Sequence, residues 1–229
     1  MTSNAASRRR LLLAACSAGL AGCSGTLLPK PPAAPARHLL DTGVAAGPAA
    51  AAAGPAAAAA PQRPPAGASS GASSGAPALL VALPRAAPGY GSARMLYQQQ
   101  PHELQAFAYN EWVDTPAQML APLLVRVLQD SGAFAVVLLA PTSAVAGLRL
   151  ETELIRLHQD FSARPSRLRL TLRAVLLDTR TRQAIAWREF DESVAATSDD
   201  PAGGVLAAQQ AVQRVLASVA VFCAQQVRR

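Results

Sequence analysis

A long segment of small residues limits how much of this 229-residue chain can fold. Residues 41–76 are almost only Ala, Pro, Gly and Ser, with no apolar periodicity and no large apolar side chain after Val44. Such a composition cannot bury enough apolar surface to offset the entropy that is lost on ordering. We therefore expect a disordered tether here, followed by one folded domain over residues 77–229.

The first 22 residues have the organisation of a secretory leader. Arg8, Arg9 and Arg10 precede an apolar stretch over residues 11–21, which is too short to remain as a membrane-spanning helix. The segment closes with Leu-Ala-Gly-Cys at residues 20–23 and resembles the signal of bacterial lipoproteins. That resemblance implies cleavage before Cys23, a diacylglyceryl group on the Cys23 thiol, and acylation of the new amine by a chain such as palmitate.

These features divide the chain into a signal peptide (1–22), a lipid-anchored linker (23–76) and a domain (77–229). A weaker match to the same Leu-small-small-Cys pattern occurs at residues 13–16, but cleavage before Cys16 would leave an apolar stretch of only residues 11–15. Two or three acyl chains make an anchor effectively permanent, and Ser24 after the lipidated cysteine implies delivery to the outer membrane. We therefore expect the domain on the periplasmic face of that membrane, on a tether with a reach of about 40 Å.

Charge and cysteine content argue against a nucleic-acid-binding protein and against a protein held together by internal disulfides. Three of the 21 basic residues precede Cys23, so the net charge of +7 falls to +4 after cleavage, and aromatic residues make up only 4%. This mild basic excess does not favour a nucleic-acid-binding protein. Cys223 is the one thiol left after cleavage and lipidation, so no internal disulfide is expected.

Periodicity in the domain predicts strands and two main helices. We expect strands over residues 78–84, 95–99, 104–109 and 134–139. We also expect a helix with Thr115 as its N-cap and Pro116 at its first position, which stops at Gly132. A second helix begins at Pro201 behind Asp200 and continues to the C-terminus.

The central strands have the clearest alternation. Apolar residues occupy even positions over residues 148–154 and odd positions after that, so we expect a bulge near Leu154. Residues 168–176 and 184–193, joined by a turn, predict an antiparallel hairpin with one wet face. The fold class is therefore α+β, an antiparallel sheet with two main helices packed on one face.

Residues 71–75 match the G-x-S-x-G spacing of a nucleophile elbow, but the match recurs at residues 67–71 as a Gly/Ser repeat with no predicted strand before it and no helix after it, so we interpret it as chance. No other residues have the spacing of a catalytic, cofactor or metal site. His38, His102 and His158 lack metal-ligand spacing and no Cys accompanies them, and we expect His158 to be a solvated surface residue on a strand. A nucleophile, base and orienting group in one place are not evident, so we expect no enzymatic activity.

Two other features have alternative interpretations. Arg167, Arg169 and Arg173 form a basic stripe that could meet lipid headgroups, although pairing with Glu151 and Glu153 across the sheet is favoured.

Trp112, with Tyr109 and Tyr90, could form a contact surface for a partner, or pack half-buried against the first helix. Cys223 is expected to be a small core residue.

The order of residues along the domain resembles that of the ABC-type transport auxiliary lipoproteins. The positions that carry this resemblance are Leu83, Pro84, Gly89, Tyr90, Met95, Tyr97, Phe107, Asn110, Trp112, Val113, Asp114, Thr115, Pro116, Asp130, Ser131, Gly132, Phe134, Leu150, Glu151, Asp160, Phe161, Ser166, Arg188 and Phe190. They are patterned positions rather than a catalytic signature, and they extend over nearly the whole domain.

This resemblance implies a non-enzymatic accessory subunit of an envelope transport system. Its partners would be an ABC ATPase, a permease and a mammalian-cell-entry type protein that together move phospholipid or other apolar molecules. The lipoprotein would dock them to the outer membrane, as a homo-oligomeric ring in one arrangement. The alternative is a structural lipoprotein, a pilotin or scaffold of another outer-membrane machine.

Overall fold

The computed structural model describes residues 34–41 and 75–228. Cys23, the signal peptide and most of the expected tether lie outside these residues. Contacts divide the chain into two units, Met1–Ala34 and Pro35–Arg229, and every helix and strand below belongs to the second unit.

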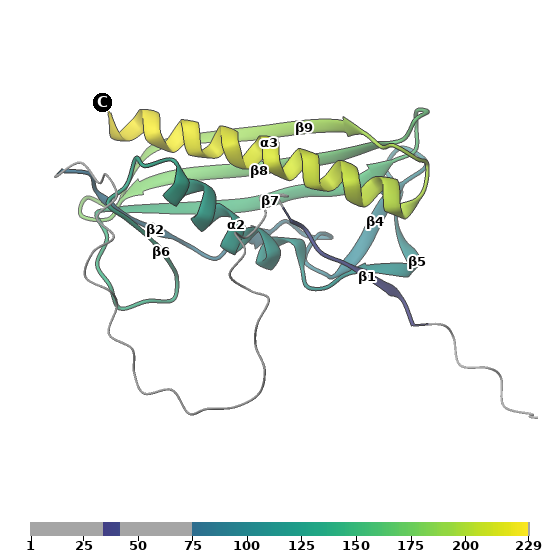
Figure 1. The fold of residues 1–229 in the computed structure, drawn as a ribbon, viewed down its shortest axis with the longest axis horizontal. Coiled ribbons are helices and arrows are strands. Elements are labelled where there is room, and N and C mark those ends of the chain that lie inside the picture. The colour runs from purple at the N-terminus through teal and green to yellow at the C-terminus, as the bar shows by residue number, and fades with distance from the viewer. Residues whose placement is uncertain (1–33, 42–74, 229) are drawn as a thin grey trace, which may run out of the picture. The chain divides into compact units, whose positions relative to one another are not determined.

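Three long antiparallel strands form the main part of the sheet, as predicted. They are β7 (Leu148–Asp160), β8 (Arg167–Asp178) and β9 (Gln183–Ala195), which run side by side along the molecule (Figure 1). On β8 the even-numbered side chains from Leu168 to Leu176 are all buried, because they face the helices.

A bulge in β7 accounts for the change of apolar phase. Leu154 lies opposite Leu172, whereas Leu157 lies opposite Leu170. Between these two pairs β7 advances by three residues while β8 advances by two, so β7 contains one extra residue. The extra residue returns Leu157 to the buried face, and the predicted bulge near Leu154 is confirmed.

The sheet is mixed, which corrects the expected antiparallel sheet. The short strands β2 (Ala78–Val81), β3 (Arg85–Ala86) and β4 (Arg94–Gln98) all pair in parallel with successive parts of β7. A long connection containing a helix separates these strands from β7, and such crossovers permit parallel pairing. The α+β class itself is confirmed.

Three more strands complete the sheet. β5 (Leu104–Trp112) pairs with β4, β6 (Val136–Leu139) pairs with β2, and β1 (Ala36–His38) pairs with β5. β1 lies inside the range 23–76 that was expected to be linker, so that boundary is wrong for residues 36–41. The physical reason is that Leu40, just beyond β1, is 3% exposed and belongs to the core.

Two helices cover one face of the sheet, as expected (Figure 1). α2 (Pro116–Asp130) begins at the cap Thr115 and contacts β2, β6 and β7. α3 (Pro201–Val227) begins at the cap Asp200 and lies over β8 and β9. The predicted apolar stripe of α3 is buried at every position, namely Val205, Ala208, Val212, Val215, Val219 and Phe222.

α3 combines length with high hydropathy. It is the one helix in the described part of the chain that is long and apolar enough to cross a membrane, with a mean hydropathy of 1.4. However, 56% of that apolar window is buried within the structure. Cys223, on the same helix, is fully buried, as expected of a core residue, and burial raises the pKa of its thiol to about 12.

Candidate functional site

The sheet face opposite the helices carries the predicted basic stripe, and its guanidinium groups have partners. Arg173 bridges Glu153 of β7 and Glu189 of β9, with N–O distances of 3.2 and 3.1 Å. Glu151 instead lies 3.1 Å from the Arg149 guanidinium of its own strand. The expected pairing across the sheet is therefore present at Arg173 but not at Glu151.

The other two arginines of the stripe are also engaged. Arg169 lies 3.4 Å from the carboxylate of Asp160, and Arg167 donates a hydrogen bond to the Ser193 hydroxyl at 2.9 Å. Burial opposes ionisation of Asp160, but hydrogen bonds from Ser162 and the charge of Arg169 outweigh it, so the pKa of Asp160 is lowered. These exposed pairs each contribute little to stability. Arg169 and Arg173 are paired with carboxylates, whereas Arg167 is held by the neutral Ser193, so a lipid headgroup that bound Arg169 or Arg173 would compete with an internal carboxylate.

His158 is buried at 6% exposure, and the expectation of a solvated histidine is wrong. Tyr90, from the connection between β3 and β4, covers the imidazole, and its hydroxyl lies 3.0 Å from His158 Nδ1. Burial, followed by the charge of Arg156, lowers the pKa of His158 to about 4. The imidazole is therefore neutral at pH 7 and acts as a packed core residue.

The three histidines do not form one site. His38 lies on β1 with Nε2 2.9 Å from Asn110 Oδ1, and His102 lies in the turn between β4 and β5 with φ of 68°. Among residues 34–41 and 75–228, no group of three or more His, Cys, Asp or Glu side chains has the arrangement of a metal site.

The expected aromatic cluster is dispersed. Trp112 is buried at 4% exposure, Tyr90 stacks on His158, and Tyr109 is 61% exposed on β5. The exposed tryptophan is instead Trp187 on β9, at 66% exposure, which the sequence analysis did not single out. Its odd position, shared with Glu189, places it on the wet face and could have revealed it.

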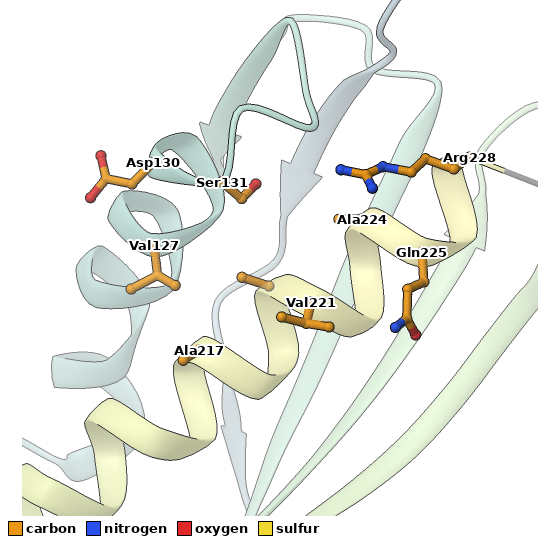
Figure 2. A pocket seen from close by; sticks show the side chains of 9 residues that line it. Val127, Asp130, Ser131, Ala217, Val221, Ala224, Gln225 and Arg228 are labelled. Atoms are coloured by element: carbon orange, nitrogen blue, oxygen red, sulfur yellow. The ribbon is translucent and has the colours of Figure 1, made fainter.

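A hollow with a volume of about 500 Å³ lies between the C-terminal ends of α2 and α3 (Figure 2). Val127 of α2 and Val221 of α3 face this groove, and the small residues Ala217, Ala220 and Ala224 of α3 also line it. Ser131, Gln225, Asp130 and Arg228 supply its polar rim.

The apolar lining of the groove can receive apolar groups. Its volume falls within the usual range of ligand sites, and its lining holds no histidine, cysteine or paired carboxylate. This groove could not be predicted from the sequence, because it requires the two helices to converge at their ends.

Comparisons with known proteins agree with the arrangement of these elements. Residues 61–220 match the model of a family described as the ABC-type transport auxiliary lipoprotein component. A search of curated proteins found no match.

The solved structures that are similar to this chain include the following two. Protein XCC0632 from Xanthomonas campestris is 26% identical over 66% of this chain and 85% of its own, with a TM-score of 0.61. A second crystal structure, of an uncharacterized protein, is 16% identical over 64% of this chain and 91% of its own, with a TM-score of 0.55, and supports the fold. Since the family match covers well over half of the sequence, the chain belongs to the family of ABC-type transport auxiliary lipoproteins.

Proposed function

We propose that this auxiliary lipoprotein is anchored in the outer membrane and docks a mammalian-cell-entry type transporter to it. The transporter, with its ABC permease and ATPase, would move phospholipid or other apolar molecules between the two membranes. The lipoprotein does no chemistry in this scheme. It holds the partner complex at a set distance from the membrane surface.

The observation that carries the proposal is the family match over residues 61–220, which follows a lipoprotein signal in the same chain. The signal supplies the anchor at Cys23, and the matched domain supplies a body whose family accompanies ABC-type transport. Diacylglyceryl and N-acyl groups on Cys23 would be its sole lipid modification.

The surface of the described domain supports docking rather than catalysis. Two arginines of its stripe, Arg169 and Arg173, pair with carboxylates within the sheet, and its most buried histidine is neutral at pH 7. The groove between α2 and α3 is apolar with a polar rim, which is the composition of protein-binding surfaces.

Lipid attachment at Cys23 is tested by labelling with a palmitate analogue and by membrane fractionation. We expect wild-type protein and a Cys16→Ala variant to incorporate the label and to sediment with the outer membrane. Cys23→Ala should lose the label and leave that fraction, because a single cysteine carries all of the acyl chains.

Two results would contradict this assignment. Label that persists in Cys23→Ala would move the anchor to another residue, and wild-type protein in the inner membrane would remove the proposed docking position.

A further inference from the structure

The sheet ends at β9 with no strand beside it in the described part of the chain. β9 pairs only with β8 and extends over 13 residues that contain neither Pro nor Gly. Long edges of this kind offer rows of unpaired N–H and C=O groups, and proteins usually protect them with outward charges, Pro or short strands. We propose that this edge binds the β9 strand of a second copy of the chain, antiparallel and about a two-fold axis. This inference does not depend on the proposed transport function.

The charged residues of β9 on the wet face do not protect the edge, because they are directed toward its own sheet. Glu189 pairs with Arg173 at 3.1 Å, and Asp191 accepts a hydrogen bond from Thr171 at 2.6 Å. Trp187, on the same face, is 66% exposed. An aromatic side chain at an open strand edge is typical of a contact surface rather than of a protected edge.

The opposite face of β9 has charges at two positions and space beside them. Arg188 lies over the Phe190 ring, with its guanidinium carbon 5.7 Å from the ring centroid, and Glu192 lies 3.8 Å from Arg214 of α3. A hollow of about 240 Å³ between β9 and α3 is lined by residues 188–192 together with Val215 and Ser218. The edge therefore has room for the side chains of an added strand.

The charges on the helix side of β9, Arg188 and Glu192, are self-complementary in one register. When the two-fold axis passes through Phe190, Arg188 lies opposite Glu192 of the partner subunit, and the same pair forms a second time by symmetry. Axes through Arg188, Glu189, Asp191 or Glu192 would instead set identical charges against each other. In the favoured register Glu189 lies opposite the partner's Asp191, and both carboxylates already have partners within their own sheet.

The same register covers Trp187. It places the indole opposite the partner's Ser193, whose hydroxyl Arg167 holds in each subunit. In this register we expect the Arg167 guanidinium of one subunit to reach the Trp187 indole of the other subunit. The resulting cation–π attraction would favour association.

The helices permit a sheet that continues across the axis. α3 lies over both β8 and β9 (Figure 1), and neighbouring strands are spaced by about 4.8 Å. Two α3 helices related by the axis would then lie about 10 Å apart, a normal distance between packed helices. The two subunits therefore do not clash above the sheet.

Charge reversal tests this pairing in the full-length lipoprotein, extracted in mild detergent and weighed by native mass spectrometry over a dilution series. Arg188→Glu and Glu192→Arg should each weaken the dimer about tenfold or more, because each reversal creates two like-charge pairs. The double variant R188E/E192R should restore dimerisation. Arg188 and Glu192 are about 13 Å apart within one strand, so restoration cannot arise within a subunit.

Reversal of a distant surface pair provides the matched control. Arg126 and Asp130 form an exposed i,i+4 pair on α2, 3.9 Å apart, and R126E/D130R should leave the dimer unchanged. Monomers at every wild-type concentration, or a dimer that R188E does not weaken, would overturn the proposal. Loss of a different co-purifying protein on R188E, without a wild-type dimer, would overturn the choice of a second copy and assign the edge to a partner's strand.

Disulfide trapping in intact membranes tests the register itself. The double variant R188C/E192C should give cross-linked dimers, since its two cysteines are too far apart to bridge within one chain. Arg188→Cys alone should not cross-link. Efficient cross-linking of this single variant would show an axis through Arg188 and contradict the proposed register.

Discussion

His158 lies beneath Tyr90 with its imidazole shielded from water, and this burial makes the stability of the domain depend on pH. Its folded pKa is about 4, below the ordinary value of 6.5 in the unfolded chain. Above about pH 6.5 the imidazole is neutral in both states. Between pH 6.5 and 4 the unfolded chain binds a proton that the folded domain does not, so the free energy of unfolding falls as pH falls.

We predict a loss of roughly 2 to 3 kcal/mol across that window, measured by urea unfolding at a series of pH values. His158→Gln should flatten the decline. Tyr90→Phe should retain it, because the ring still buries the imidazole. An undiminished decline in His158→Gln would assign the pH dependence to other groups.

Gly204 lies where the backbone of α3 approaches Gln159 of β7 too closely for a larger residue. A Cβ at this position would overlap Oε1 of Gln159, and Gln159 is itself buried and held by hydrogen bonds to Ser166 Oγ and Asp200 O at 2.8 and 3.2 Å. The glycine therefore lets the first turn of α3 lie directly on the end of β7.

We predict that Gly204→Ala lowers the free energy of unfolding by about 2 kcal/mol, although Ala is the better helix former by about 1 kcal/mol. Gly91→Ala is the control, since no atom lies within 4 Å of its added Cβ. Gln159→Ala should lower the free energy of unfolding by less in the Gly204→Ala variant than in the wild-type protein, because it removes the side chain that the new Cβ overlaps. If the losses of the two substitutions were fully additive, the overlap would be excluded as the cause of the Gly204→Ala effect.

At the scale of elements, β1 joins the domain through a few residues. His38 pairs with Trp112 in the parallel ladder, Val113 donates a backbone hydrogen bond to the His38 carbonyl at 2.9 Å, and Leu40 enters the core. A three-residue strand is stable here because its apolar neighbour is anchored.

Leu40→Ala should therefore destabilise the domain by about 2 to 4 kcal/mol, whereas Leu39→Ala, at a position 55% exposed, should change stability by less than about 0.5 kcal/mol. Chemical denaturation of both variants measures this. Equal effects at the two positions would mean that residues 36–41 do not contribute to the core.

Helices and strands with a clear apolar periodicity could be predicted from the sequence, whereas the strands that pair with them could not. The α3 stripe and the bulge near Leu154 follow from which positions are apolar, because periodicity reports which face is buried. Periodicity does not report which strand lies alongside or in which direction, so the parallel pairing of β2, β3 and β4 with β7 was missed. His158 was misassigned for a related reason, since the cover that buries it comes from Tyr90, far away in the sequence.

At the scale of the whole described domain, one layer of helices covers a mixed sheet, with Arg169 and Arg173 of the wet face paired with carboxylates and an open edge at β9 (Figure 1). The described residues present a groove between the ends of α2 and α3 and an open strand edge at β9, and both are suited to contact with other molecules. The family could be inferred from patterned residues along the chain, whereas the groove and the edge depend on tertiary structure.

The central claim is that the lipoprotein docks a transporter, and affinity purification from mild-detergent membranes tests it most directly. Full-length protein should recover a mammalian-cell-entry type protein with its permease, ATPase and bound phospholipid, as identified by mass spectrometry. Cys23→Ala should recover much less, because the unanchored domain is no longer held at the outer membrane. Recovery of a secretion or outer-membrane assembly complex, with no transporter component, would contradict the claim and identify the protein as a scaffold of that machine.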